Sequence, residues 1–376
     1  MAVENRWLIG KAAVQGVSHL AAGVPCQDYC EVETSPDGRW LVAAISDGAG
    51  SAAKAAEGAQ IVAQSIVRGL IGEVARLERD GPGLWLKDRV YSILLDTRER
   101  LRRTGDDIRD YHCTLVGTFI GPTGGILFHV GDGAAIASRI KLVARAQAQV
   151  QELQLWNDVV FSEPENGEYA NETFFITQDD WIKHLRGNIL SPGVDIVALM
   201  TDGAMPFAIQ QGQPNAPFMD PLIGQMLRAG DAAERDAILQ KYLSLPKANE
   251  VTNDDKTLMI AIRRDMADFE QFKIIPSTTV MLMNSLADMA KPKDPNSFET
   301  TEEPQPLPKV TLLISLLALA IAIAALTLSG LALYQGRLHK PVPISMQPSN
   351  NDAAPRPPGD NPRIDGGTDA PSNSPK

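Results

Sequence analysis

The sequence has few cysteines and no excess of positive charge. Only three cysteines occur in 376 residues, at 26, 30 and 113, and none forms a Cys-x-x-Cys pair. This excludes a disulfide framework and a four-thiolate zinc site, and it favours a reducing compartment. The 35 basic residues are outnumbered by 46 acidic ones and form no cluster, so nucleic acid is not expected as the main partner. A GxxxxGK[ST] nucleotide-binding loop is also missing.

Hydrophobic runs are short except for one near the C-terminal end. The N-terminus shows no secretory signal, because Glu4 lies near its start and no apolar run of about 7 to 15 residues follows. In contrast, Val310 to Leu333 contains no charged residue. As a helix this stretch would be roughly 36 Å long, enough to cross a hydrocarbon core of about 30 Å. The sequence therefore predicts one transmembrane helix.

Composition divides the chain into four expected segments. These are a folded domain at 1–264, a Pro- and Glu-rich linker at 265–309, a transmembrane helix at 310–334 and a disordered polar tail at 335–376. Basic residues on the two sides of the span are too evenly balanced to orient it. A folded domain that precedes a single span most simply stays in the cytoplasm, so we expect a single-pass membrane protein with a cytoplasmic domain.

Patterns of apolar residues predict both strands and helices within the folded domain. Short runs rich in β-forming residues predict strands at 40–45, 126–130, 196–200 and 258–262. Apolar residues spaced by three and four predict helices at 52–77, 84–103 and 231–245.

Acidic residues lie at the ends of the predicted strands. Asp47, Asp132 and Asp202 each follow a strand and precede a glycine, and Asp254 comes just before the fourth strand. Carboxylates at strand ends can meet at one rim, where their repulsion calls for a cation. Oxygen ligands, to which the Gly48 carbonyl could be added, suit Mg²⁺ or Mn²⁺. An ordinary turn explains one Asp-Gly pair, but the repeated pattern favours a metal site.

Short motifs occur in the order typical of one enzyme family. They are GVSH and GVPCQD within 16–28, SDGAGS at 46–51, CTL at 113–115, VGDG at 130–133, MTDG at 200–203 and DDKT at 254–257. Over residues 7–264 the chain resembles the bacterial branch of the metal-dependent Ser/Thr protein phosphatases, the type 2C or PPM class. The resemblance implies an α+β fold, an α/β/β/α sandwich of two antiparallel sheets flanked by helices.

The same resemblance implies a site with two Mn²⁺ or Mg²⁺ ions. Asp47 would bridge the ions, Gly48 would contribute its backbone carbonyl, Asp202 and Asp254 would ligate one ion, and Asp28 would hold metal-bound waters. A metal-activated water would then attack the phosphorus directly, without a phosphoenzyme. Phosphorylated proteins and a cognate Ser/Thr kinase are the expected partners.

Three departures from the family pattern affect this expectation. No Arg precedes Asp28 to grip phosphate, and His19 is the best local substitute, either as a hydrogen-bond donor to phosphate or as the acid that protonates the leaving alkoxide. The acid that often helps to hold a third ion is replaced by Met205-Pro206-Phe207, so Asp132 and Asp202 would bind a third cation only weakly. Asp255 replaces the usual Asn, which leaves Asp254 and Asp255 as alternative ligands.

Three functions are consistent with these residues. The first is a membrane-anchored Ser/Thr protein phosphatase, favoured because the whole set of acids is present. The second is a weak or inactive pseudophosphatase that binds phosphoproteins or relays a signal, favoured by the missing Arg. The third, a small-molecule phosphohydrolase, shares the chemistry and would need a deep closed pocket.

Overall fold

The computed structural model describes residues 7–143, 151–165, 173–264 and 272–274. The chain divides into two units, 1–292 and 293–376, and every described residue belongs to the first. The predicted transmembrane helix and tail lie outside the described residues, as does the predicted linker apart from 272–274. Within the described ranges, no helix is both long enough and apolar enough to cross a bilayer.

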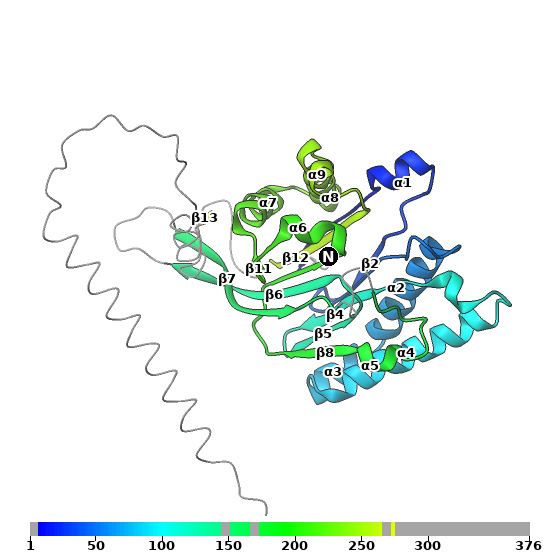
Figure 1. Cartoon of the computed structure of the whole chain (residues 1–376). Helices are drawn as coiled ribbons and strands as arrows, with labels where there is room; N and C mark the ends of the chain where they lie inside the picture. Colours follow the sequence, from blue (N-terminus) through cyan, green and yellow to red (C-terminus); the bar gives the residue numbers. More distant parts are fainter. Residues whose placement is uncertain (1–6, 144–150, 166–172, 265–271, 275–376) are drawn as a thin grey trace, which may run out of the picture. The chain divides into compact units, whose positions relative to one another are not determined.

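Two β-sheets form the centre of the first unit (Figure 1). The six-stranded sheet has the order β1 (Trp7–Val14), β12 (Lys256–Arg263), β9 (Ile196–Met200), β6 (Ala134–Val143), β7 (Gln151–Ser162) and β13 (Phe272–Ile274). The five-stranded sheet has the order β2 (Tyr29–Thr34), β3 (Leu41–Ser46), β4 (Leu115–Gly121), β5 (Gly124–Val130) and β8 (Arg186–Leu190). The strands β10 (Ile209–Gln210) and β11 (Gln213–Pro214) pair with each other as a short hairpin.

Helices cover the outer faces of both sheets. The longer ones are α2 (Ala55–Ile71), α3 (Val74–Asp80), α4 (Leu84–Arg102), α7 (Ala216–Arg228) and α8 (Ala232–Leu243). The short ones are α1 (Val17–Ala22), α5 (Trp181–His184), α6 (Met205–Ala208), α9 (Pro246–Val251) and the 3₁₀ turns η1 (Ile108–Tyr111) and η2 (Asp202–Ala204).

Strand β3 shows why the central strands read as continuous apolar runs. Leu41, Ala43 and Ile45 point into the core between the two sheets, whereas Val42 and Ala44 belong to the core beneath α2 and α4. Because alternate side chains point to opposite faces, a strand buried on both faces needs apolar residues at every position. This explains why the sequence pattern identified β3.

Three hydrophobic cores stack between four layers. One core lies between the five-stranded sheet and α2 with α4, one lies between the sheets, and the third packs Leu222 and Met226 of α7 and Leu239 of α8 against the six-stranded sheet. The expected sandwich of two sheets flanked by helices is therefore confirmed. One pairing differs from the expectation, because β13 runs parallel to β7.

The predicted elements agree with the observed ones except at one break. The strand expected at 196–200 coincides with β9, and the helices expected at 84–103 and 231–245 correspond to α4 and α8. The helix predicted at 52–77 is wrong as a single element, since α2 ends at Ile71 and α3 begins at Val74. Gly72 lies at this break, where its low helix propensity favours a stop.

Candidate active site

Asp47 follows the last residue of β3 and is held by Thr114 from the loop before β4. The Asp47 amide donates to the Thr114 hydroxyl at 3.1 Å, and the Thr114 amide donates to the Asp47 carbonyl at 2.8 Å. The next residue, Gly48, pairs with Cys113. A Cβ on Gly48 would lie 2.6 Å from the backbone of Ala55, so only glycine fits this turn.

A pocket of about 410 Å³ opens beside Asp47. Segments from the two ends of the folded unit and from the turn after β3 line it: Ser18, His19, Asp47, Gly48, Gly50, Thr252, Asn253 and Asp254. Four residues singled out from the sequence, namely His19, Asp47, Gly48 and Asp254, therefore share one cavity wall.

The predicted acids gather around Asp47. Burial raises the pKa of the Asp47 carboxyl well above its ordinary value of 3.8, and the charges of Asp28, Asp202, Asp132 and Asp254 raise it further. Buried like charges disfavour one another's ionised forms unless a cation neutralises them. Four acids from distant parts of the chain thus act on Asp47.

Asp202 and Asp132 each follow a strand end at this rim. Burial raises the pKa of Asp202 to about 6, and the charges of Asp132 and Asp254 add to this rise. Its Oδ1 atom is buried and accepts no hydrogen bond. Burial also raises the pKa of Asp132, opposed by a hydrogen bond that the Thr173 hydroxyl donates to its carboxylate.

Asp28 is buried and is not among the residues that line the pocket. The Thr201 hydroxyl donates to its Oδ2 at 2.8 Å, whereas its Oδ1 is buried without a hydrogen-bond partner. Burial raises the pKa of Asp28 to about 7; the neighbouring Thr257 and Thr201 hydroxyls oppose this rise, and the charges of Asp255 and Asp202 add to it. A carboxylate in this position costs free energy unless a cation compensates its charge.

Oxygen donors of this kind suit a hard divalent cation. No group of three or more His, Cys, Asp and Glu side chains in the described ranges is already arranged to hold one metal ion. Mg²⁺ is commonly held by only one or two carboxylates with water completing the octahedron, so such a group is not required. Two buried carboxylate oxygens without partners, on Asp28 and Asp202, lie within the acidic cluster. The residues therefore fit Mg²⁺ or Mn²⁺.

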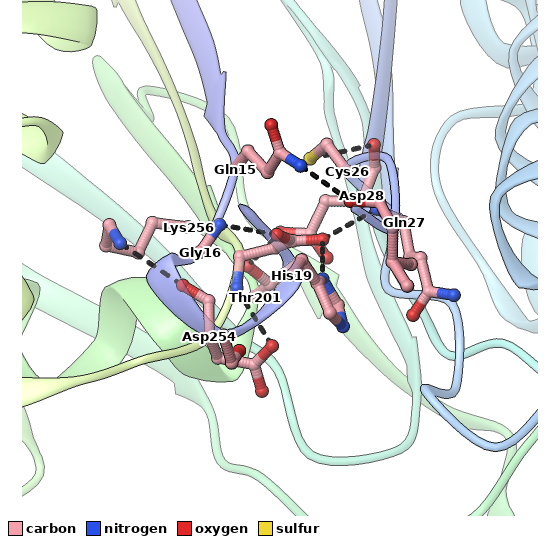
Figure 2. A network of polar contacts seen from close by, with 12 residues as sticks. Gln15, Gly16, His19, Cys26, Gln27, Asp28, Thr201, Asp254 and Lys256 are labelled. Atoms are coloured by element: carbon pink, nitrogen blue, oxygen red, sulfur yellow. Dashed lines mark hydrogen bonds and ion pairs between the residues drawn. The ribbon is translucent and has the colours of Figure 1, made fainter. Parts of the chain in front are cut away.

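The adjacent acids Asp254 and Asp255 have different surroundings. Asp254 is exposed and lines the pocket, and its Oδ1 accepts the Asp255 amide at 2.8 Å. Asp255 is only 3% exposed, and its two oxygens accept the amides of Gly16 and Gln27, both at 2.6 Å (Figure 2). Only Asp254 is therefore open to the pocket.

His19 lies on α1 and reaches both the pocket and Asp255. Its Nδ1 atom is 2.9 Å from Oδ2 of Asp255. The amide and hydroxyl of Ser18 both donate to the Asn253 carbonyl, at 3.1 and 2.7 Å, which holds α1 against the loop before β12. No Arg or Lys is among the described residues that line this cavity.

The residues that follow Asp202 pack against apolar side chains. Met205 contacts the core of the six-stranded sheet, and the Phe207 ring lies 5.9 Å from that of Phe218 on α7. These side chains stand where the family pattern often has an acid.

Sequence reasoning missed the residues that support the acids. The hydroxyl of Thr201 binds Asp28 and also accepts the Thr257 amide at 3.0 Å, and Thr252 and Asn253 form part of the pocket wall. A signal was available for two of them, because Thr201 precedes Asp202 directly and Thr257 closes the DDKT motif.

Comparison with known proteins identifies relatives that match more than half of the chain. A family model described as Protein phosphatase 2C matches residues 15–244. The serine/threonine-protein phosphatase 3 of Escherichia coli (strain K12) is 30% identical over 269 residues, which cover 68% of this chain and 98% of that protein.

Solved structures with low sequence identity also match this unit. The serine/threonine phosphatase Stp1 from Staphylococcus aureus is 12% identical, with a TM-score of 0.43 and coverage of 70% of this chain and 97% of that one. The serine-threonine phosphatase 2C from Toxoplasma gondii is 11% identical, with a TM-score of 0.46 and coverage of 68% and 94%.

Proposed function

The chain belongs to the protein phosphatase 2C family, and we propose that it hydrolyses phosphoserine and phosphothreonine in proteins by metal-assisted attack of water. The observation that carries this proposal is Asp47, a half-buried carboxylate that lines an open pocket and feels the charges of four other acids. A binding module without turnover has no need for such a costly cluster of like charges.

Each acid has a role that follows from its surroundings. Asp47, the Gly48 carbonyl, Asp202 and Asp254 would hold two Mn²⁺ or Mg²⁺ ions, and Asp132 with Asp202 would hold a third weakly. When bound, the ions lower the pKa of water and offset charge on the phosphoryl oxygens. Asp28, whose Oδ1 accepts no hydrogen bond, would orient water for attack in line with the leaving oxygen.

His19 would act on the substrate in place of the missing Arg. It is the single basic side chain among the described residues that line the pocket, so it can donate to a phosphate oxygen or protonate the leaving alkoxide.

Phosphatase activity can be tested on the full chain with a matched pair of variants. Hydrolysis of a phosphothreonine peptide and of p-nitrophenyl phosphate is measured with Mn²⁺, with Mg²⁺ and with EDTA, for wild type, Asp202→Asn and Asp220→Asn. Burial raises the pKa of Asp220, like that of Asp202, to about 6, but Asp220 lies on α7 and accepts a hydrogen bond from the Trp156 indole of β7. We expect Asp202→Asn to lose at least about 100-fold in activity and Asp220→Asn to keep it.

Two other results would redirect the interpretation. A folded chain that binds Mn²⁺ in a calorimeter but hydrolyses neither substrate would favour the pseudophosphatase alternative. That alternative is supported by the lack of an Arg among the described residues that line the pocket. Preference for small phosphate esters over the peptide would favour the small-molecule alternative.

We also propose that residues 310–334 anchor the protein in a membrane with residues 1–264 on the cytoplasmic side. The support is the uncharged stretch from Val310 to Leu333. A linker at 265–309 would then keep the phosphatase near membrane-bound phosphoproteins and their kinase, which raises its effective concentration toward them. The test is carbonate extraction of cell membranes, which should retain the full chain and release a variant lacking 310–334; release of both would reject the anchor.

A further inference from the structure

We propose that Asp255 is a positioning residue, which holds His19 so that the imidazole Nε2 faces the leaving oxygen of the phosphoprotein substrate. This inference rests on the proposed phosphatase function. It assigns His19 to protonation of the leaving group, and it gives the acidic residue at position 255 a role distinct from that of its neighbour Asp254.

The Asp255 carboxylate is a fixed acceptor. Its Oδ1 accepts the Gly16 amide and its Oδ2 accepts the Gln27 amide, both at 2.6 Å, so two backbone segments determine where it lies. The His19 Nδ1 atom is buried and lies 2.9 Å from Oδ2, although it makes no aligned hydrogen bond to any described residue (Figure 2). At this separation Oδ2 of Asp255 is within hydrogen-bonding reach of Nδ1.

The other ring nitrogen of His19 faces the pocket. A Cβ placed on Gly50, which lines the pocket, would lie 4.0 Å from Nε2. When a carboxylate accepts the Nδ1 proton of an imidazole, it sets the tautomer and the ring orientation, and it leaves Nε2 free for chemistry. His19 therefore has one nitrogen engaged with Asp255 and the other available to substrate.

This arrangement connects two departures from the family pattern. The amides of Gly16 and Gln27 donate to the carboxylate at 255, and Nδ1 of His19 lies 2.9 Å from one of its oxygens. An aspartate offers two acceptor oxygens, whereas an asparagine offers one oxygen and an NH₂ group that would face a donor. Asp at 255 and His in place of the phosphate-gripping Arg thus fit together as one unit.

The proton transfer balances over one turnover. The oxygen of a water molecule bonds to phosphorus while the bond from phosphorus to the Ser or Thr oxygen breaks. That oxygen takes the proton from Nε2 of the imidazolium, which leaves a neutral His19 with its proton on Nδ1 beside Asp255. The proton released by the attacking water restores the imidazolium, and the products are the free hydroxyl side chain and inorganic phosphate.

Leaving-group dependence separates this role from a structural one. An alkoxide needs a proton to leave, whereas p-nitrophenolate leaves without one. In the full chain purified in detergent with Mn²⁺, we expect Asp255→Asn and His19→Gln each to lower kcat on a phosphothreonine peptide by at least about 10-fold. The expected loss on p-nitrophenyl phosphate is less than about 3-fold. Equal losses on both substrates would overturn the proposal.

A double variant controls for the backbone contacts of Asp255. If Asp255 acts through His19, adding Asp255→Asn to His19→Gln should lower peptide hydrolysis no further, although the melting temperature falls as in Asp255→Asn alone. If Asp255 only anchors Gly16 and Gln27, its substitution lowers activity by the same factor in both backgrounds, and the proposal fails.

A measurement independent of activity reads the tautomer directly. The chain has five histidines, so ¹⁵N-histidine labelling gives a tractable imidazole spectrum, in which His19→Gln assigns one signal set. We expect neutral His19 to carry its proton on Nδ1 in the wild type and to lose this preference in Asp255→Asn. An Nε2–H tautomer in the wild type would overturn the inference even if the phosphatase is active. An inactive chain with the expected tautomer would instead refute the proposed function.

Discussion

The hydroxyl of Thr201 donates to Oδ2 of Asp28 at 2.8 Å and connects the acid site to the paired strands behind it. The same hydroxyl accepts the amide of Thr257 at 3.0 Å, and the Thr201 amide donates to the Thr257 carbonyl at 3.1 Å. Thr201 follows β9 and Thr257 lies in β12, which pairs with β9. Asp28 is therefore positioned by the sheet itself, through one side chain.

Replacing Thr201 by Val should weaken both stability and metal binding. The substitution keeps the shape but leaves the buried Thr257 amide without its side-chain acceptor and Asp28 without one donor. We expect unfolding to be easier by about 1–3 kcal/mol, measured in urea with EDTA. Mn²⁺ affinity, measured by calorimetry, should fall about 10- to 100-fold. Thr201→Ser keeps the hydroxyl and should retain most of the affinity; equal losses in the two variants would contradict this role.

The metal-free protein should lose stability as pH rises from about 4 to 7. Burial raises the pKa of Asp28 to about 7 and that of Asp202 to about 6, above the ordinary 3.8. In this window the folded state binds more protons than the unfolded state, so the free energy of unfolding falls with increasing pH and levels off above about 7. Urea unfolding with EDTA between pH 4.5 and 8 measures the slope.

Saturating Mn²⁺ provides the control for that slope. The cation stabilises the ionised carboxylates, so the decline from the site acids should disappear when it is bound. The contribution of Asp220, whose pKa is about 6 and which contacts Trp156, should remain with Mn²⁺ and vanish in Asp220→Asn. An identical slope with EDTA and with Mn²⁺ would show that the site acids do not titrate in this way.

Gly16→Ala should destabilise the segment that carries Asp254 and Asp255. An added Cβ would lie 2.4 Å from the Asn253 carbonyl oxygen and 2.4 Å from the Asp254 carbonyl carbon, so the backbone must shift. We expect a loss of about 1–3 kcal/mol in the free energy of unfolding, with weaker Mn²⁺ binding. Thermal unfolding and calorimetry measure both effects.

Gly72→Ala is the matched control for this substitution. Gly72 has a right-handed helical conformation with φ of −68°, and no atom lies within 4 Å of its added Cβ. Alanine there should leave stability unchanged or raise it by about 0.4–1 kcal/mol. A loss in Gly72→Ala as large as that in Gly16→Ala would indicate a general sensitivity to glycine replacement.

Much of the fold was predictable because burial on two faces leaves a strong sequence pattern. Strands such as β9, which is buried at all five positions, appear as uninterrupted apolar runs. Short or partly exposed strands, such as β2 and β8, carry no such run and were missed. Strand β4 was also missed although it is buried throughout, because Gly117 and Thr118 interrupt its apolar run. The layered arrangement itself came only from the family resemblance, since periodicity does not say which strands pair.

The sequence by itself determined which acids stand at strand ends, because the apolar runs and the Asp-Gly pairs are local features. It did not separate Asp254 from Asp255, nor reveal that His19 contacts the latter. Those facts depend on the register of β1 against β12, in which Val14 pairs with Lys256 and brings Gly16 to Asp255, a residue 239 positions away. Contacts between segments so distant in the chain arise only when the sheet forms, and for this reason the tertiary structure decided which carboxylate faces the pocket.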